Sequence, residues 1–554
     1  MNIVMKVKEE KNEKDITNND LDFRMEYFKK YLKYSGLEFN SYQYEGVKWC
    51  VQNELRGLQK GVNKDEKSSS EGDFYKGGGF IADEMGLGKT ILMIGTFLSH
   101  FVPKTLIVVP LVLVDQWYQQ IYKTTGHKAI VFHGSSRWSI DLELELEKKG
   151  ILIVITTYDL IIPNSLKKNN KNTNNKNTNK KNNLKVDLER KNKKNNLKVD
   201  ILHSLVWDRI VFDEGHHLRN KKTLKYMGAL SLKCCGARWI VSGTPIQNKK
   251  SDFYHLCAMV GFASSFYTNP DNIPLFVHNY ILKRTKKQVG INIADIAFHN
   301  DSISWKNKQE MLLSKDIHSH LSFSNLKSIP TNSLSLKGWK DPGVDLNRLV
   351  VMMRARQCCI LPKLVCPIKE FTSGLLKEAL LSTSKIDSVI NKIIERKENG
   401  NGKLVFCHYK EEMDEIRGRL IRNGLNDESI QLLDGRIRMG KRKEILNSGK
   451  YLVLILQIQT GCEGLNLQEH YNEIYFVSPH WNPAVEDQAV ARCHRIGQKK
   501  QVDVFRFEMD AFKNEDLDKD LKDDKEELVE ELPSLSIDSY VASVQERKRL
   551  EVVF

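Results

Sequence analysis

The 554-residue sequence has no C-x-x-C pair, although it contains ten cysteines. Four of them form two adjacent doublets, Cys234-Cys235 and Cys358-Cys359, and the others are scattered along the chain. This spacing fits neither a disulfide framework nor a zinc ribbon or RING finger. It therefore favours a reducing compartment inside the cell.

Long apolar runs are also missing. Runs such as Thr105–Val114 and Ile151–Ile155 are too short to span a bilayer. The first residues, MNIVMKVKEEKNEKD, are charged and lack the apolar core of a signal peptide. We therefore expect a protein that is neither secreted nor embedded in a membrane. An apolar content of 41% excludes collagen-like, mucin-like and wholly disordered chains.

Basic residues outnumber acidic ones, 85 to 70, which gives a formal net charge of +15. A basic surface favours polyanions, with nucleic acid as the first candidate and an anionic membrane as the second. Part of the excess comes from residues 167–198, which are almost entirely Lys and Asn and contain KKNNLKVD twice, counting on to residue 200. Such a tract predicts a disordered surface insertion, either inert or brushing phosphates nonspecifically.

Two regions alternate short Val- and Ile-rich runs with helical stretches, which indicates parallel α/β sheets. We expect a polar leader at 1–36 with a short helix around Leu21–Leu32, and a first α/β unit at 37–285. An irregular helical connector is expected at 286–384, and a second α/β unit at 385–508. Residues 509–554 are expected to form an acidic stretch followed by an amphipathic helix.

The strongest local signal is Gly77-Gly-Gly-Phe-Ile-Ala-Asp-Glu-Met-Gly-Leu-Gly-Lys-Thr90. It joins an apolar strand, a glycine-bearing loop and a helix-compatible run. Gly86 and Gly88 allow backbone N–H groups to turn toward phosphate oxygens, and Lys89 supplies a positive charge. The Thr90 hydroxyl suits Mg²⁺. The general pattern G-x-x-x-x-G-K-[ST] has Asp83 in place of its first glycine, and a glycine-rich turn of similar appearance is the alternative.

Two further clusters fit the same chemistry. Arg209-Ile-Val-Phe-Asp-Glu-Gly-His216 ends an apolar strand in two carboxylates, of which Asp213 can hold Mg²⁺ through water and Glu214 can deprotonate the attacking water. Arg492 and Arg495 are spaced i, i+3 and would point the same way on a helix, as a γ-phosphate requires. A basic solvated helix face is the alternative for this arginine pair.

The order and wording of these motifs resemble the SWI/SNF-type DNA translocase ATPases of helicase superfamily two. The resemblance covers roughly residues 37–508 and the C-terminal helix. It rests on Phe39–Trp49, DEMGLGKT at 83–90, Pro110–Trp117, His133-Gly134, Thr156–Tyr158, Trp207–Asn220, Ser242–Asn248, Lys403–His408, Thr460–Leu467, His480–Pro483, Asp487–Gln498 and Ser536–Lys548.

The resemblance implies two RecA-like lobes of the P-loop NTPase class, with ATP and Mg²⁺ held between them. Catalysis is assigned to Lys89, Glu214, Arg492 and Arg495. Nucleotide binding is assigned to Gln43, Asp83, Glu84, Met85, Gly86, Leu87, Gly88, Lys89, Thr90, Asp213 and Gly464, with Thr90 and Asp213 at the metal. DNA contacts are assigned to Pro110, His133, Thr157, Thr460, Gly461 and Trp481, although Trp481 fits a packing role equally well.

The sequence also departs from its relatives. Its wording is nearest the branch that resembles the helicase-like transcription factor, yet it lacks the cysteines of a RING finger. High Lys and Asn usage suggests an AT-rich genome of a large DNA virus or a protist, and hence the nucleus or a viral factory. We expect a monomeric motor that translocates on double-stranded DNA and strips bound proteins. A strand-separating DNA or RNA helicase and a non-enzymatic DNA-binding scaffold are the alternatives.

Overall fold

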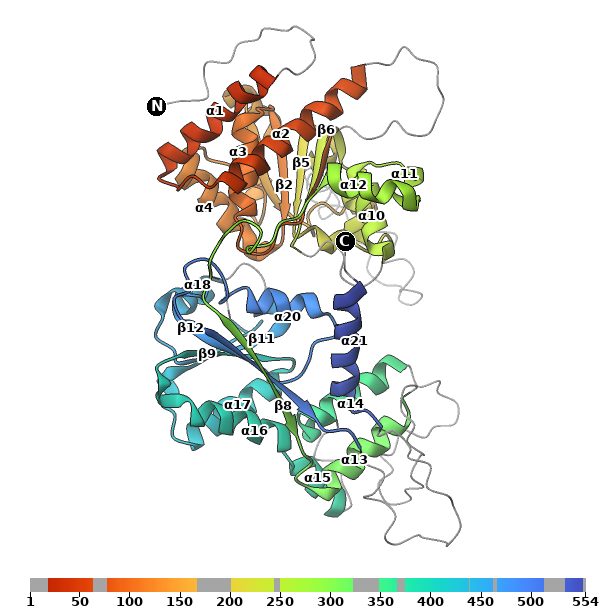
Figure 1. Ribbon diagram of the computed structural model, residues 1–554, viewed down its shortest axis with the longest axis vertical. Helices are drawn as coiled ribbons and strands as arrows, with labels where there is room; N and C mark the ends of the chain where they lie inside the picture. The colour runs from red at the N-terminus through yellow and green to blue at the C-terminus, as the bar shows by residue number, and fades with distance from the viewer. Residues whose placement is uncertain are drawn as a thin grey trace, which may run out of the picture. The chain divides into compact units, whose positions relative to one another are not determined.

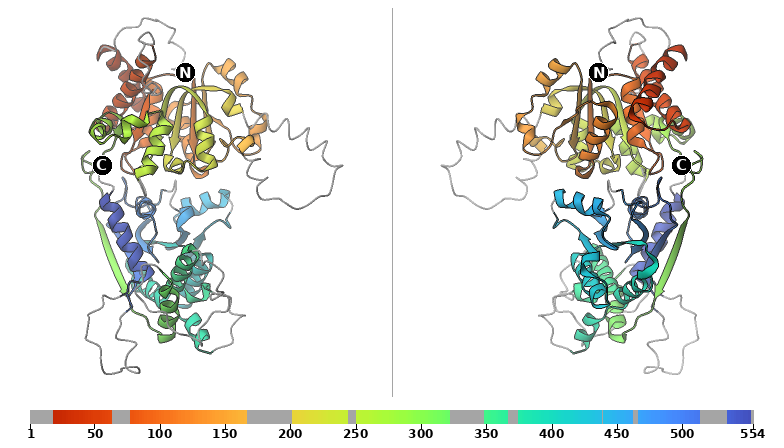
Figure 2. Two further views of the ribbon diagram at one scale, coloured as in Figure 1. Left: turned by 90° about the vertical axis from the view of Figure 1, so that its right-hand side faces the viewer. Right: turned by 90° about the vertical axis from the view of Figure 1, so that its left-hand side faces the viewer.

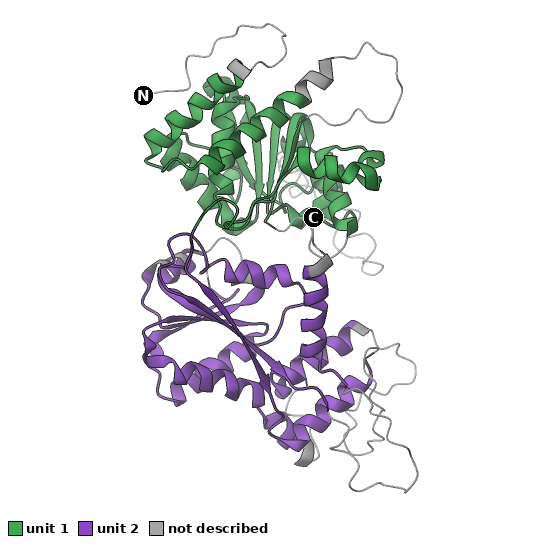
Figure 3. Cartoon of the chain, viewed as in Figure 1, with its two compact units in different colours: residues 1–291, 554 green, residues 292–553 purple. Residues whose placement is uncertain are grey.

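The computed structural model describes two compact units (Figures 1 and 3). The first runs to residue 291 and the second starts at residue 292. The described residues are 18–62, 77–166, 201–243, 250–321, 348–365, 374–437, 439–461, 466–512 and 534–551. The predicted Lys/Asn insertion lies outside them. Within these ranges no helix is long and apolar enough to cross a membrane.

The first unit is built on a seven-stranded parallel sheet in the order β3-β4-β2-β5-β6-β1-β7. Its strands are β1 (Gly78–Ile81), β2 (Lys104–Val109), β3 (Ile130–Val131), β4 (Leu152–Thr157), β5 (Val206–Asp213), β6 (Lys233–Val241) and β7 (Ile281–Leu282). Because all strands run in the same direction, the loops that follow them emerge at one edge of the sheet.

Helices cover both faces of this sheet, as the side views in Figure 2 show. They are α1 (Asn18–Ser35), α2 (Ser41–Val62), α3 (Lys89–Ser99), α4 (Val114–Thr125), α5 (Leu142–Lys149), α8 (Ile201–Ser204), α9 (Leu224–Ser231), α10 (Lys250–Val260), α11 (Ser264–Thr268) and α12 (Ile273–Tyr280). Alternate residues of one strand enter different layers. In β2, Leu106 and Val108 pack with α9, α10 and α12, whereas Ile107 and Val109 pack with α1 to α4. Strands that are apolar on both faces require this double covering.

Helix α1 belongs to the first unit, although the sequence interpretation placed it in a polar leader. Leu21, Met25 and Phe28 are spaced for one helix face and are fully or almost fully buried. The Phe28 ring lies against Gly95 of α3, where a Cβ would come within 2.6 Å of it. The charged residues that gave the segment its polar composition occupy the opposite face.

The second unit contains a six-stranded parallel sheet in the order β10-β11-β9-β12-β13-β8. Its strands are β8 (Ile296–Ile303), β9 (Gly402–Cys407), β10 (Ile430–Leu433), β11 (Val453–Gln457), β12 (Tyr471–Phe476) and β13 (Val502–Met509). In β9, Leu404 and Phe406 enter one apolar cluster, while Val405 and Cys407 enter the other. The predicted α/β class with two parallel-sheet units is confirmed.

The helices of the second unit are α13 (Lys308–Ser319), α14 (Arg348–Ile360), α15 (Gly374–Leu381), α16 (Ser384–Glu395), α17 (Lys410–Arg422), α18 (Met439–Ser448), α19 (Ile458–Gly461), α20 (Pro483–Val490) and α21 (Ile537–Glu551). Much of the segment interpreted as a helical connector lies inside this unit. Residues 296–303 form the edge strand β8, parallel to β13. Leu313 of α13 and Cys358 of α14 are fully buried in its larger apolar cluster. An edge strand that carries polar residues such as His299 and Asn300 has no continuous apolar run to announce it.

The C-terminal helix α21 is fastened to the second unit by buried polar contacts at its start. The Asp538 carboxylate accepts hydrogen bonds from Ser478 Oγ at 2.9 Å and from the Met509 amide at 3.2 Å, and it pairs with the buried ammonium of Lys385. The amide of Ile537 donates to His318 Nε2 at 2.9 Å. These contacts join the helix to α13, α16 and the end of β13.

Candidate nucleotide-binding edge of the first sheet

Three loops that carry predicted functional residues emerge beside one another in the first unit. They follow β1, β6 and β5, which are consecutive neighbours in the sheet. The loop after β1 leads through Gly86 and Gly88 into α3, the loop after β5 begins with Glu214, and β6 is followed by Ser242 and Gly243. Parallel strands bring these loops to the same edge, although they are widely separated in the sequence.

The phosphate loop has a shape that requires glycine at two positions. Gly86 has φ = 93° and Gly88 has φ = 79°, in the region that disfavours residues with a Cβ. A Cβ on Gly88 would also lie 2.6 Å from Gln43 Nε2. Helix α3 then starts at Lys89, so its unpaired N-terminal amides face the loop. Lys89 Nζ donates to the backbone oxygens of Asp83 at 2.8 Å and Glu84 at 3.3 Å.

The side chains of this loop differ in their access to a ligand. The Asp83 carboxylate is fully buried and pairs with Arg284, and Leu87 is 1% exposed. These two side chains therefore hold the loop, and only their backbone groups can reach a nucleotide. Glu84 is engaged by Lys286 with an N–O distance of 3.1 Å. Met85 lies next to Gly243, whose Cβ would come 3.1 Å from Met85 Cγ.

Gln43, in the first turn of α2, is placed against the phosphate loop. Its Nε2 donates to the Leu87 oxygen at 3.5 Å and to Tyr42 Oη at 3.3 Å, and the residue is 8% exposed. The predicted adenine reader and the phosphate loop thus lie together.

Asp213 ends β5 in a nearly enclosed position. Its Oδ2 accepts a hydrogen bond from Trp117 Nε1 at 2.7 Å, and its Oδ1 accepts one from the Glu214 amide at 3.0 Å. Its backbone oxygen accepts from Tyr158 Oη at 2.7 Å. Burial, and then the neighbouring Glu214 carboxylate, raise the pKa of Asp213 to about 6, although Trp117 and the charge of Lys89 act in the opposite direction.

Glu214 is the one non-glycine residue with positive φ among the described ranges, at φ = 51°. Such a backbone conformation is uncommon for a residue with a side chain and is typical of functional sites. Its Oε2 lies 3.3 Å from His216 Nδ1, which is also 3.3 Å from Ser242 Oγ. His216 thereby links the loop after β5 to the loop after β6. The rest of the predicted Ser242–Asn248 motif, from residue 244 on, lies outside the described residues.

The predicted DNA-facing residues of this unit are also at the carboxyl ends of strands. Pro110 follows β2, Thr157 ends β4 and His133 comes two residues after β3. Pro110 and Thr157 are buried, and His133 is half-buried. Contacts of the first two with a nucleic acid would therefore use backbone groups.

In the second unit, Arg492 and Arg495 lie in turns rather than on a helix. Helix α20 ends at Val490, and the amides of Arg492 and Cys493 bond to oxygens three residues back. The structure thus corrects the helical spacing argument. The two guanidinium groups are nonetheless close, because burial and then the charge of Arg492 lower the pKa of Arg495. Arg495 donates to Asn466 Oδ1, and Arg492 Nε is buried without a hydrogen-bond partner in the described part of the chain.

The other predicted residues of this unit are placed less fully. Thr460 and Gly461 form the end of α19, and Gly464 lies outside the described residues. Trp481 packs against the larger apolar cluster, with the Arg356 guanidinium 5.2 Å from its ring centre. Its backbone oxygen accepts a hydrogen bond from Lys548 of α21 at 2.9 Å. This environment gives Trp481 a packing role.

Comparison with known protein families gives a match over most of both units. Residues 42–364 match the SNF2-related domain, and residues 384–497 match the helicase conserved C-terminal domain. The chain belongs to the SNF2-related family. Members of this family are ATP-dependent helicase-like hydrolases that act on DNA, so the predicted family and enzyme class are confirmed, as is the RecA-like P-loop fold.

Curated SNF2-related proteins from several sources are similar to this chain. A probable global transactivator of Orgyia pseudotsugata multicapsid polyhedrosis virus is 26% identical over 491 residues, which cover 85% of this chain and 86% of that protein. The ATP-dependent DNA helicase DDM1 of Arabidopsis thaliana is 24% identical over 530 residues, and the match spans 85% of this chain but only 59% of DDM1.

Among solved structures, the match titled "Sulfolobus solfataricus SWI2/SNF2 ATPase core in complex with dsDNA" has 20% identity and a TM-score of 0.35. It covers 86% of this chain and 88% of that one.

Sequence reasoning missed several residues that shape this SNF2-related site. It quoted Trp117, Tyr158 and Lys286 only as motif letters or not at all, and it gave no partner to Asp83. One signal was available, since an aspartate in place of a glycine at the start of a phosphate loop needs a cation when it is buried. The sequence offered no way to identify that cation as Arg284, 201 residues further along.

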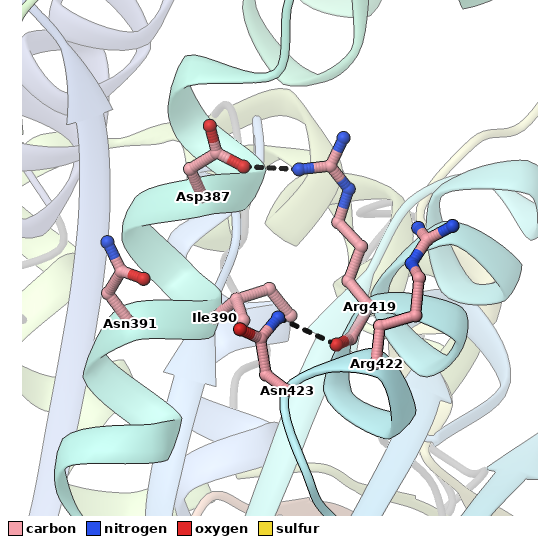
Figure 4. A pocket seen from close by; sticks show the side chains of 6 residues that line it. All are labelled: Asp387, Ile390, Asn391, Arg419, Arg422 and Asn423. Carbon is pink, nitrogen blue, oxygen red and sulfur yellow. Dashed lines mark hydrogen bonds and ion pairs between the residues drawn. The ribbon is translucent and has the colours of Figure 1, made fainter.

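A separate cavity of about 410 Å³ lies between α16 and α17 of the second unit (Figure 4). No predicted nucleotide or DNA residue lines it. Its charged groups already have partners, since Arg419 pairs with Asp387 and Glu415. Asn423 Nδ2 donates to the Arg419 backbone oxygen at 2.9 Å. We assign it no ligand.

Proposed function

We propose that this SNF2-related protein is an ATP-dependent translocase on double-stranded DNA that remodels or strips protein–DNA complexes. The observation that carries the proposal is the convergence of three loops at one sheet edge. A glycine-shaped loop with Lys89 at a helix N-terminus lies there beside the paired carboxylates of Asp213 and Glu214. This is the equipment of phosphoryl transfer to water.

The residues at this edge fit ATP with Mg²⁺. Two adjacent carboxylates with a raised pKa on Asp213 favour a nearby cation. In the described ranges no group of three His, Cys, Asp or Glu could hold a metal by itself, which agrees with Mg²⁺ that keeps waters and phosphate oxygens as ligands. Thr90 and Asp213 would hold the ion, which when bound neutralises charge on the phosphates. Gln43 would contact adenine, and residues 83–90 with Gly464 would complete the nucleotide site.

The catalytic roles follow from the chemistry of each side chain. Lys89 binds the outer phosphates once it leaves the backbone oxygens that it now contacts. Glu214, whose backbone aims its carboxylate away from the strand, orients and deprotonates water. Arg492 and Arg495 supply charge to the γ-phosphate as negative charge develops, and the buried Arg492 Nε without a described partner suits an anionic ligand.

We further propose that the motor acts on DNA as a monomer, in the nucleus or in a viral factory, and without a membrane partner. The net charge of +15 favours a phosphate backbone. Pro110, His133, Thr157, Thr460, Gly461 and Trp481 remain the proposed contacts. Their backbone and small polar groups can position a duplex without reading its sequence.

The test compares ATPase rates without DNA, with single-stranded DNA and with duplex DNA. It also compares displacement of a third strand from a triplex with unwinding of a forked duplex. We expect strong stimulation by duplex DNA that falls steeply with salt, because neutralised phosphates release counterions. Triplex displacement without fork unwinding supports translocation. Efficient fork unwinding, or stimulation by RNA alone, would instead indicate a strand-separating helicase.

A further inference from the structure

The segment through which the chain leaves the first unit is bound to the phosphate loop. This exit segment, Leu282–Lys286, continues β7. Arg284 encloses the Asp83 carboxylate with its backbone amide at 3.1 Å, its Nε at 3.0 Å and a further bond from Nη2. Because the Asp83 side chain is fully buried, this planar, multidentate pairing is what makes a carboxylate tolerable beneath the loop.

Backbone contacts extend the attachment along the exit segment. The amide of Ala82 donates to the Leu282 oxygen at 2.7 Å, and the amide of Glu84 donates to the Arg284 oxygen at 2.9 Å. In return, Lys286 donates its amide to Glu84 Oε2 at 2.8 Å, and its Nζ lies 3.1 Å from Glu84 Oε1. Two consecutive loop residues are thus each held by a basic residue of the exit segment.

Arg284 also reaches the adenine side of the site. Its Nη1 donates to the Tyr42 backbone oxygen, and its guanidinium lies 5.4 Å from the centre of the Tyr42 ring. A Cβ on Gly46 would come 2.8 Å from Arg284 Nη2, so α2 approaches this side chain closely. Arg284 therefore joins three elements, namely the phosphate loop, the start of α2 beside Gln43, and the exit segment.

Nucleotide binding would act directly on this junction. Lys89 Nζ contacts the backbone oxygens of Asp83 and Glu84, the same two residues whose carboxylates hold Arg284 and Lys286. A phosphate group competes for that ammonium, and its arrival changes the contacts of both residues. We propose that Arg284 is a positioning residue for the nucleotide and, with Lys286, transmits occupancy of the phosphate loop to the exit segment. The proposal rests on the proposed nucleotide-binding function.

The experiment measures binding of a fluorescent ADP analogue and amide hydrogen exchange of residues 283–291, in the full chain with and without ADP. Arg284→Lys keeps the charge but loses the planar fork, so we expect binding about tenfold weaker. In the parent, ADP should change the exchange rate of this peptide several-fold, and the response should be lost in Arg284→Lys. Lys287→Ala, at an exposed neighbouring position, is the matched control and should behave like the parent.

Glu84→Gln provides a second variant because this side chain is 41% exposed and less critical for folding. It should bind ADP with near-parent affinity yet blunt the exchange response, since only the charge opposite Lys286 is lost. Parent-like binding and exchange in both variants would overturn the inference while leaving the nucleotide site intact. A parent protein that binds no ADP analogue would instead overturn the proposed function, and this inference with it.

Discussion

The two halves of strand β5 treat buried charge in opposite ways. Arg209, in its first half, donates Nε to Glu54 Oε1 at 2.6 Å and Nη2 to Glu54 Oε2. Trp239 Nε1 donates to the same carboxylate at 2.8 Å, and His100 contacts it as well. At the other end of the strand, Asp213 stands beside a second carboxylate, Glu214, rather than a cation.

The pKa values record this difference. Burial alone would raise the pKa of Glu54, but Arg209 and His100 lower it to about 2. The pKa of Asp213 is raised to about 6 by burial and by Glu214. The Glu54 cluster stabilises the fold, whereas the Asp213–Glu214 pair is poorly compensated within the protein. The difference indicates that the compensating charge at the second end comes with a ligand.

The largest expected effect concerns the uncompensated end. Glu214→Gln keeps the size of the side chain and removes the base, so ATP turnover should fall by a factor of about 10² to 10⁴. Nucleotide affinity should stay within a few-fold of the parent, as measured by titration with a fluorescent ATP analogue. Turnover at the parent rate would place the base elsewhere and remove the functional half of the comparison.

Glu54→Gln should produce the largest loss of stability. It leaves the Arg209 guanidinium buried without a counter-charge, which costs about 3–5 kcal/mol in the free energy of unfolding. Chemical denaturation followed by circular dichroism measures it. Glu45→Gln, on an exposed face of the same helix, is the matched control and should change stability by less than about 0.5 kcal/mol. An equal response of the two variants would contradict the role given to the Glu54 cluster.

The same cluster predicts how stability depends on pH. A carboxylate whose pKa is depressed in the folded state stabilises the protein above its unfolded pKa and loses that effect as pH falls through the folded value. For Glu54 this window extends from about 4.5 down to about 2. The parent should therefore lose stability across that range, and Glu54→Gln should show a shallower acid decline. Parallel acid declines would show that Glu54 is not ionised in the fold.

The comparison also marks what the sequence could predict. The phosphate loop and the Asp213–Glu214 pair are contiguous motifs, and the strands before them are apolar runs, so both could be recognised locally. Parallel order then required the loops to share an edge. The Glu54–Arg209 pair could not be found this way, because its members are 155 residues apart and each is unremarkable in its own segment.

Other differences arose where a local pattern was weak or misleading. Helix α1 hides its apolar face among charged residues, and β8 is an edge strand without a continuous apolar run. Arg492 and Arg495 have helical spacing, yet α20 ends at Val490 and the chain turns beneath them. The buried Cys493 between them packs into the smaller apolar cluster of the second sheet. Tertiary packing thus overrode the periodicity of the sequence.

Asp213→Asn should have the opposite sign to Glu54→Gln. Because a raised pKa means that the charged carboxylate is disfavoured in the fold, stability without ligand falls as pH rises from about 3.8 to about 6. Removing the charge should therefore raise the free energy of unfolding at pH 7 by about 2 kcal/mol, while ATP turnover is lost. Denaturation without nucleotide or metal measures this. A destabilised Asp213→Asn protein would contradict the proposed difference between the two ends of β5.

The smallest expected effect tests how the uncompensated end is held in place. Tyr158 Oη donates to the Asp213 backbone oxygen at 2.7 Å, and the tyrosine is 3% exposed. Tyr158→Phe removes this neutral hydrogen bond and leaves a buried carbonyl without that donor, so the free energy of unfolding should fall by about 1 kcal/mol. Tyr122→Phe, at a residue that is 42% exposed, is the matched control and should leave stability unchanged. Because the side chains of Asp213 and Glu214 are untouched, ATP turnover should fall by less than about tenfold. A loss of turnover comparable to that of Glu214→Gln would show that the position of the β5 backbone, and not the charge pair alone, governs hydrolysis.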